Sequence, residues 1–423
     1  MRCRNFKEFK GGLDQAKTDS SEKCDVSDYK VYLHSSIDEV IADKWNALVS
    51  KKSVFLTTEY FDALRILDEN LSYKFACFFC GDDLIGAAAF QITIAESDDL
   101  TANIAKRGKF IKSVTEKLIG NKSMRFRVLV LGNSFATGEH GFVFTEGIAP
   151  SVQGTLLLKA IDEIENSCKE EGQRISATVI KDFYPESFDV AASFAQEGYA
   201  EFFVDPNMIM SLKPEWKSFD DYLSSMTTKY RTKAKAAFKR SKEIELKDLK
   251  AEDLLTYQKE LFALYEKVYD RADFRLGKLN GEVFQRMKDN LGESFTLKGY
   301  FLHDKLVGFQ SAFTYEDWID THFVGIDYEL NNEYAIYSRM LYEYIKMGIE
   351  GNVKHISFGR TAGEIKSTVG AYPMDVKCYI RHRTKASNAL LKILFGYIKP
   401  SEFSQRVPFK KAELDNIEGY QVQ

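Results

Sequence analysis

Two segments of this chain repeat one hairpin plan, and the repeat limits the folds that the whole chain can adopt. Residues 74–90 contain an apolar strand pattern, a polar Gly-Asp-Asp turn and a second strand that opens with Leu-Ile-Gly. Residues 296–313 repeat this plan and open the second strand with Leu-Val-Gly. Apolar strands joined by a short polar turn predict β-hairpins. Because the copies share a turn and a register, we predict a duplicated unit.

The segments around the two hairpins extend the repeat. A helix-like segment precedes each hairpin, and a strand, a helix, a short strand and a closing hairpin follow it. In the first half the segments are 58–70, 140–147, 152–171, 174–180 and 198–212; in the second they are 281–291, 319–327, 336–350, 355–359 and 372–383. This order predicts an α/β fold of two similar units, each built on a mixed (α+β) sheet.

Length and composition agree with two domains. A chain of 423 residues with 44% hydrophobic content can bury two cores of ordinary size. We place the domains at 30–213 and 214–385, with an N-terminal arm at 1–29 and a C-terminal tail at 386–423; the arm is polar and poorly patterned, which predicts disorder. The net charge of -4 argues against a protein that coats nucleic acid, so we expect no DNA partner.

The chain reads as cytoplasmic. Its N-terminus lacks the apolar core of a signal peptide, and no run approaches the roughly 20 apolar residues that span a bilayer. Its six cysteines are scattered, which suits a reducing compartment. Cys77 and Cys80 form a C-x-x-C pair, but residues three apart on a strand point to opposite faces. We therefore predict buried thiols there and no metal site.

The strongest charge feature is residues 229–242, which contain seven cations and no anion. The less polar residues recur at helical spacing, which predicts a helix (227–243) with one packing stripe, lying between the halves. Those residues are Tyr230, Ala234, Ala237, Phe238 and Ser241. The helix is either a solvated connector or a docking surface for the phosphates of a carrier. The candidate carrier-binding residues are Arg231, Lys233, Lys235 and Lys239.

Two other segments raise the question of lipids. Residues 103–120 interleave lysines with large apolar side chains, and residues 390–398 are also apolar. Such a segment either packs on its own domain or makes a peripheral contact with an anionic membrane.

Residues 357–371 combine glycines and cations at the expected end of a strand. They contain Gly359, Arg360, Lys366 and Gly370. Glycines beside fixed cations let a backbone approach a charged or polarised ligand, although the same residues also form ordinary turns.

The order of elements, the Leu-Val-Gly strand and the glycine-flanked segment after a later strand resemble the Gcn5-related N-acyltransferase (GNAT) fold. Two such units joined by a basic helix resemble the FemABX aminoacyltransferases and the related FemAB-like or BioF2-like acetyltransferase domains. The resemblance covers about residues 30–385, and the best-matched stretch is 306–371.

The resemblance implies transfer of an acyl or aminoacyl group from an activated carrier to an amine. In the family fold, the oxyanion is bound by backbone N–H groups where two parallel strands splay apart, which here are 319–327 and 355–359. By similarity, Lys366 stabilises the developing negative charge, and Arg360 holds a carboxylate or phosphate. Gly359, Gly370 and Tyr337 are further substrate-binding candidates.

Asp320 and His322 are the candidate acid and base. They lie on one face of the predicted central strand, because side chains alternate with period two. A histidine on a strand is also often only packed and hydrogen-bonded.

The sequence does not identify the donor or the acceptor of the transferred group. Residues 331–338, which correspond to the phosphate loop of the acetyl-coenzyme A enzymes, contain no glycine and carry Glu333. One function is an N-acyltransferase that uses acyl-CoA, acetyl-CoA or an acyl carrier protein and acts on a small-molecule, amino-acid or lipid-precursor amine. The alternatives are an aminoacyl-tRNA-dependent transferase in cell-envelope (peptidoglycan) biosynthesis and a non-catalytic ligand-binding module.

Overall fold

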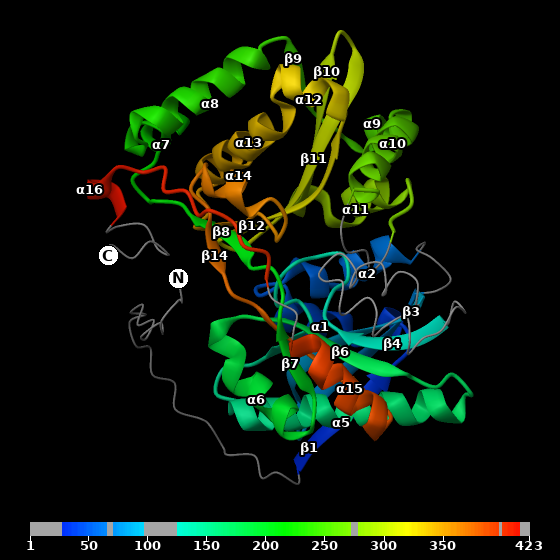
Figure 1. Ribbon diagram of the computed structural model, residues 1–423. Helices are drawn as coiled ribbons and strands as arrows, with labels where there is room; N and C mark the ends of the chain where they lie inside the picture. Colours follow the sequence, from blue (N-terminus) through cyan, green and yellow to red (C-terminus); the bar gives the residue numbers. More distant parts are fainter. Residues whose placement is uncertain (1–27, 66–70, 97–124, 272–277, 397–399, 415–423) are drawn as a thin grey trace.

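The chain folds into two halves that lie one above the other (Figure 1). The computed structural model describes residues 28–65, 71–96, 125–271, 278–396 and 400–414. The predicted arm at 1–29 lies almost wholly outside these residues, and the basic segment at 103–120 lies outside them entirely. Both predictions are therefore untested.

Each half is built on one mixed sheet, as the fold class predicts. Within the described residues the first sheet has the order β1-β2-β3-β4-β6-β15-β7, and β5 pairs with β3. Its strands are β1 (Tyr29–His34), β2 (Leu71–Cys80), β3 (Asp83–Glu96), β4 (Arg125–Leu131), β5 (Phe142–Phe144), β6 (Ala177–Phe183), β7 (Ala200–Phe203) and β15 (Lys377–His382).

The second sheet has the order β14-β8-β13-β12-β11-β10-β9 among the described strands. Its strands are β8 (Asn207–Ser211), β9 (Ile244–Asp248), β10 (Phe295–Leu302), β11 (Lys305–Tyr315), β12 (Trp318–Ile326), β13 (His355–Ser357) and β14 (Tyr372–Met374).

Helices cover both faces of each sheet. The first half carries α1 (Ala42–Val49), α2 (Thr58–Leu64), α5 (Pro150–Glu170) and α6 (Phe188–Gln196), and α15 (Lys385–Gly396) packs beside β7. The second half carries α7 (Phe219–Ser225), α8 (Thr228–Arg240), α9 (Ala251–Thr256), α10 (Gln258–Tyr269), α11 (Val283–Leu291), α12 (Tyr328–Tyr334), α13 (Ile336–Glu350), α14 (Gly363–Ser367) and α16 (Lys411–Leu414).

The predicted duplication is confirmed at the level of register. In the β2–β3 hairpin Phe78 pairs with Gly86, and a bulge follows Phe78; in the β10–β11 hairpin Tyr300 pairs with Gly308, and a bulge follows Tyr300. The glycine of each Leu-Ile/Val-Gly motif thus takes the same place. A side chain at Gly86 would lie 2.4 Å from the Phe144 ring, so the motif lets the neighbouring strand approach closely.

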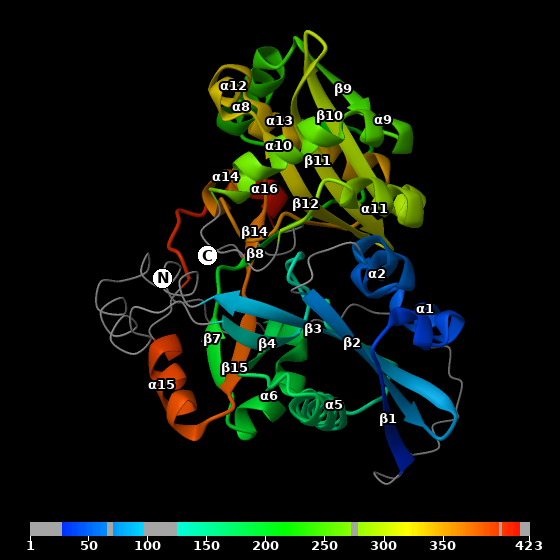
Figure 2. The same ribbon diagram turned by 90° about the vertical axis from the view of Figure 1, so that its right-hand side faces the viewer.

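The predicted closing hairpins at 198–212 and 372–383 are wrong in their pairing. Strand β8 leaves the first half and pairs with β13 and β14, while β15 leaves the second half and pairs with β6 and β7 (Figure 2). A division at residues 213 and 385 therefore does not separate the two sheets. An apolar strand pattern indicates a strand but does not say which sheet the strand joins. Each exchanged strand lies inside the sheet of the opposite half, with a partner on both sides.

The predicted position of the basic helix is also wrong. Helix α8 has the expected stripe, because Tyr230, Ala234, Ala237 and Ser241 are buried. It packs on α13 at the far side of the second half, however, and not between the halves (Figure 1). The stripe predicts that the helix packs but does not identify its partner.

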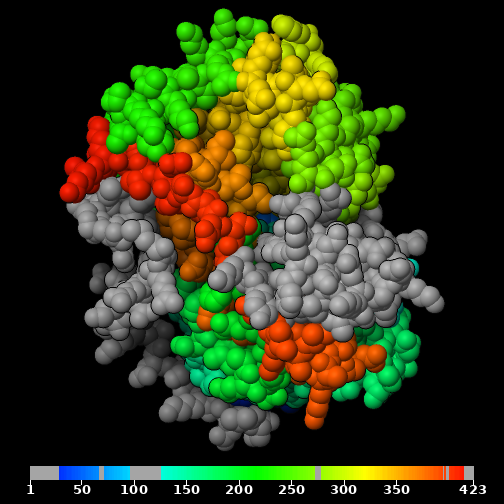
Figure 3. Space-filling view, viewed as in Figure 1, coloured from blue at the N-terminus to red at the C-terminus, as the bar shows by residue number. Residues whose placement is uncertain are grey.

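The segment 400–414 from the C-terminal tail crosses the second half and covers α14 (Figure 3). Phe403 packs against Gly363, Arg406 pairs with Glu364, and Phe409 packs against Gly370. Residues 400–414 are thus an integral layer of the second half, whereas α15, the other described part of the tail, packs on β7 and β15 of the first sheet.

One hydrophobic cluster joins the two halves. It contains residues of α1, α2 and β2 from the first half and of α10, α11 and β11 from the second. Phe55, in the turn before α2, is 1% exposed and contacts the rings of Tyr60, Phe313 and His322. Among the described helices, none is both long and apolar enough to cross a membrane.

Because of the exchanged strands and the shared cluster, we expect the described parts of both halves to unfold in one transition. Phe55→Ala should lower the free energy of unfolding by about 3–5 kcal/mol, because it leaves a cavity where the halves meet. Urea unfolding followed by circular dichroism and by tryptophan fluorescence measures this. Two separated transitions, or a loss no larger than that of the exposed Leu255→Ala, would contradict it.

Candidate active site at the junction of the halves

The predicted splay between two parallel strands is present in the second half. Strands β12 and β13 pair over three residues, ending at Asp320 and Ser357. Beyond Ser357 the chain turns through Gly359, whose φ of +74° is in the left-handed region that glycine adopts without strain. Beyond Asp320, β12 pairs only with β11 among the described strands. The inner edge of β12 therefore faces the opening between the strands.

Lys366 lies at this opening, as its place after Gly359 predicts. Helix α14 brings its Nζ within 3.2 Å of the carbonyl oxygen of Gly359, to which it donates a hydrogen bond. The side chain is almost fully buried, with 4% of the residue exposed. Burial lowers the pKa of Lys366 to about 7, because the charged form has left water.

Asp320 and His322 both lie beside Phe313. Asp320 is opposite Phe313 in the ladder and accepts a hydrogen bond from the Tyr315 hydroxyl. Burial raises the pKa of Asp320 to about 6. His322 packs 4.8 Å from the Phe313 ring. Burial lowers the pKa of His322 to about 3, so its ring is neutral at physiological pH.

The corresponding opening in the first half is filled. There β4 and β6 pair in parallel as far as Leu131 and Ile180. The loop 132–141 follows β4, and Lys181 Nζ donates to the carbonyl oxygens of Asn133 (2.7 Å) and Ala136 (3.2 Å) in that loop. The first half thus closes its own opening with a loop and a buried lysine.

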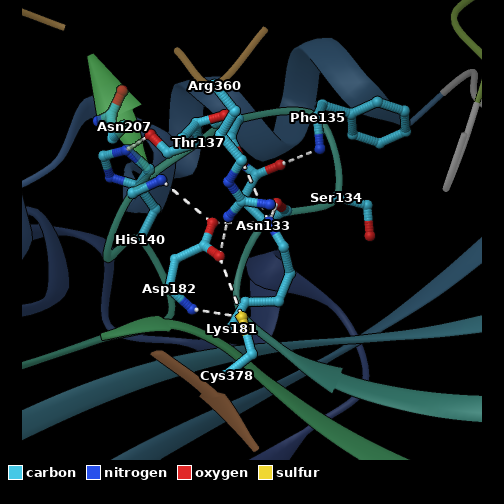
Figure 4. Close-up of polar contacts among 12 residues, drawn as sticks. Asn133, Ser134, Phe135, Thr137, His140, Lys181, Asp182, Asn207, Arg360 and Cys378 are labelled. Atoms are coloured by element: carbon cyan, nitrogen blue, oxygen red, sulfur yellow. Dashed lines mark hydrogen bonds and ion pairs between the residues drawn. The ribbon is translucent and has the colours of Figure 1, made fainter. Parts of the chain in front are cut away.

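A buried carboxylate, that of Asp182, connects this loop to the second half (Figure 4). Asp182 is 0% exposed and has a φ of +64°, two residues beyond the last β4–β6 pair, just as Gly359 lies two residues beyond the last β12–β13 pair. Its donors among the described residues are Lys181 Nζ (3.0 Å), the Gly138 N–H (3.2 Å), Cys378 Sγ (3.4 Å) and Arg360 Nη2.

Lys181 makes three hydrogen bonds, two to carbonyls and one to Asp182, which is the pattern of an ammonium group. Burial and the nearby charge of Arg360 nevertheless lower the pKa of Lys181 to about 7. Two cations therefore share one buried carboxylate, which offsets the cost of removing their charges from water.

The predicted substrate-binding residues do not gather at one point. Gly359 and Arg360 lie at the junction, but Arg360 is engaged by Asp182. Gly370 (φ +114°) is packed against Phe409, and the Tyr337 backbone caps the start of α13 through the Asn331 side chain.

The predicted carrier-binding residues lie on α8, away from the junction. Lys233, Lys235 and Lys239 are exposed, and Arg231 is partly buried. Of these four residues, only Lys233 lines the two adjoining pockets, of about 410 and 150 Å³, that lie between α8, α13 and α14. Both pockets also contain Ile365 and Thr368, so they form one groove.

Sequence reasoning missed the loop 132–141, Lys181, Asp182 and Cys378. The signal was present: Asn, Ser, Thr, Glu and His stand among three glycines in ten residues, and a Lys-Asp pair ends a buried strand. The partner of Asp182 was not predictable, because Arg360 is 178 residues away in the chain.

No group of three or more His, Cys, Asp or Glu side chains in the described residues is placed to hold a metal ion. Cys77 is a buried free thiol, as predicted, and burial raises its pKa to about 11. Cys80 is disulfide-bonded, so the prediction of a thiol is wrong there. A strand pattern shows which face a cysteine occupies but not whether a distant cysteine reaches it.

We expect Asp182→Asn to lower the free energy of unfolding by about 3–5 kcal/mol, because it leaves the buried Lys181 and the partly buried Arg360 without a counter-charge. Asp62→Asn is the matched control, since Asp62 also pairs with an arginine but is exposed; its loss should be about 1 kcal/mol or less. Urea unfolding at pH 7 measures both. Equal losses would contradict the account of Asp182.

Lys366 should make stability depend on pH. Its pKa falls from 10.5 in the unfolded chain to about 7 in the folded chain. Between these values the unfolded chain binds more protons, so the contribution of Lys366 to stability rises with pH. Lys366→Met cannot titrate, and its stability advantage over wild type should shrink as pH rises from 7 to 10.5. A difference that stays constant across urea unfolding at several pH values in this window would contradict the shift.

Comparison with known proteins supports the fold. A crystal structure of FemX superposes with a TM-score of 0.53 at 12% identity, covering 86% of this chain and all of FemX. A tandem GNAT protein from the clavulanic acid biosynthesis pathway superposes with a TM-score of 0.47 at 9% identity, covering 84% of this chain and 98% of that protein. No family model matches the sequence. No curated protein matches it either. The FemX comparison confirms the predicted FemABX-like fold as a fold.

Proposed function

We propose that this protein transfers an acyl group from an activated carrier to an amine, at the opening between β12 and β13. The observation that carries the proposal is the buried Lys366 Nζ beside the Gly359 carbonyl at this opening. Burying a lysine with one hydrogen bond to the protein costs stability, and a site that binds developing negative charge gives a reason for that cost. The matching opening in the first half is filled by its own loop.

The chemistry needs few groups. The neutral acceptor amine attacks the acyl carbonyl, a C–N bond forms, and negative charge develops on the carbonyl oxygen. Lys366 in its ammonium form stabilises that charge. Asp320, with a pKa of about 6, takes the proton that the attacking nitrogen loses. The carbon–sulfur bond of a thioester then breaks, and the thiolate leaves with the carrier.

The groove between α8, α13 and α14 is the proposed path of the carrier. Leu341, Tyr342 and Ile365 give it apolar walls, and Lys233 and Arg240 place two cations along its α8 side. This combination suits a carrier with a phosphate and an apolar arm, such as acyl-CoA, acetyl-CoA or an acyl carrier protein. The acceptor is the amine of a small molecule, an amino acid or a lipid precursor.

An aminoacyl-tRNA donor is the second candidate, as in cell-envelope transferases. The observation in its favour is that Lys235 and Lys239 continue the exposed cations of α8 beyond the groove. Binding of a long polyanion would weaken steeply with salt, whereas binding of acyl-CoA would weaken less. A peripheral membrane contact would be consistent with a lipid-precursor acceptor.

The test is turnover with panels of acyl-CoA and aminoacyl-tRNA donors against amine acceptors. With an active pair, Lys366→Ala should lower kcat about 100-fold and change the donor affinity little, because the lost interaction forms mainly in the transition state. Lys354→Ala, at an exposed lysine of the same half that pairs with Asp317, should behave as wild type.

Near-wild-type turnover of Lys366→Ala would remove Lys366 from the mechanism. Failure of every donor class to react, with the protein folded and Lys366 titrating near pH 7, would contradict the transferase and favour a non-catalytic ligand-binding module.

A further inference from the structure

A small polar space lies beside Gly359, at the end of β13. A Cβ atom built on Gly359 would be 3.9 Å from Lys366 Nζ and 3.9 Å from Thr137 Oγ1. Apart from the chain neighbours of Gly359, no other heavy atom of the described residues lies within 4 Å of that point. Two hydrogen-bond donors, one from each half, thus flank the same space.

Thr137 belongs to the loop 132–141, and buried side chains hold the backbone on both sides of it. The Ala136 carbonyl accepts from Lys181 Nζ at 3.2 Å. The Thr137 carbonyl accepts from His140 Nε2 at 3.2 Å, and the Gly138 N–H donates to Asp182 at 3.2 Å. Three successive residues are each fixed by a different side chain, so the position of the Thr137 hydroxyl is determined by the first half.

The same carboxylate fixes the other side of the space. Asp182 Oδ2 accepts from Gly138, the residue after Thr137, and Oδ1 accepts from Arg360, the residue after Gly359. One buried group therefore sets how far Thr137 lies from the end of β13. A loop that served only as a connection would not need this arrangement.

We propose that Thr137 Oγ–H and Lys366 Nζ together bind the oxygen of the acyl carbonyl beside Gly359, so that one active site is built from both halves. The inference rests on the proposed function and names a further substrate-contacting residue for it. A carbonyl or carboxylate oxygen in this space accepts one hydrogen bond from the hydroxyl and one from the ammonium. Lys181, Asp182 and His140 are positioning residues, because they act through the loop.

A binding experiment tests the space without a known substrate. Sodium acetate supplies a small carboxylate probe, and the side-chain NMR signal of Lys366, assigned by its absence in Lys366→Met, reports binding to the full-length protein labelled on lysine. Acetate should shift this signal in wild type. Thr137→Val should weaken acetate binding about five-fold, the effect of one lost hydrogen bond of about 1 kcal/mol.

Two variants serve as controls. Thr137→Ser keeps the hydroxyl and should bind acetate as wild type does. Thr155→Val removes the hydroxyl of an exposed threonine on α5, which donates to the Ser151 carbonyl oxygen of the same helix, and should have no effect. Should Thr137→Val fail to fold, Thr137→Ala makes the same comparison. Acetate that leaves the Lys366 signal of wild type unchanged, or that binds Thr137→Val equally well, overturns the proposal.

Kinetics separate this inference from the proposed function. With an active donor and acceptor, Thr137→Val should lower kcat about 100-fold while Thr137→Ser restores it, and KM should change little. Turnover that depends on Lys366 but not on Thr137 would overturn the shared site and leave the transferase intact. Acetate binding as predicted, with no turnover for any donor, would overturn the transferase and leave the binding space intact.

Discussion

The carboxylate of Asp182 is the group on which the junction of the two halves depends. It is fully buried, and it neutralises one cation from its own half, Lys181, and one from the other half, Arg360. A buried charge is tolerated only when it is paired and hydrogen-bonded, so these groups can be buried only together. Because Asp182 also binds the Gly138 N–H, the ion pair fixes the loop 132–141 against the end of β13.

Two further features support this junction. The exchanged strands β8 and β15 give each sheet a strand from the opposite half, so neither sheet is complete without the other. The cluster around Phe55 buries aromatic rings of both halves against each other. A polar site between the two halves needs such support, because a small rotation of one half would separate Thr137 from Gly359. The duplicated fold thus has two openings. The loop 132–141 fills the first opening and places Thr137 beside Gly359 at the second.

Much of the fold was predictable from local patterns. The two hairpins, their matching glycines and the buried stripe of α8 follow from alternation and helical spacing, which each segment carries in its own residues. The place of Lys366 followed from the short distance in sequence to Gly359. Three features could not be predicted from local patterns: the strand exchange, the position of α8 and the Asp182–Arg360 pair. Each depends on which distant partner a segment meets. A polar, glycine-rich loop such as 132–141 has the composition of an ordinary turn until its partners are known.

Amide hydrogen exchange of Asp182→Asn, compared with wild type, tests most directly whether one carboxylate couples the halves. Segments that lose a structural anchor open locally and exchange faster, while the rest of the fold keeps its protection. We expect faster exchange both in the loop 132–141 of the first half and in residues 358–362 of the second, with α5 and α13 unchanged. Faster exchange in the first half alone would contradict the coupling through Asp182 and the shared site built on it.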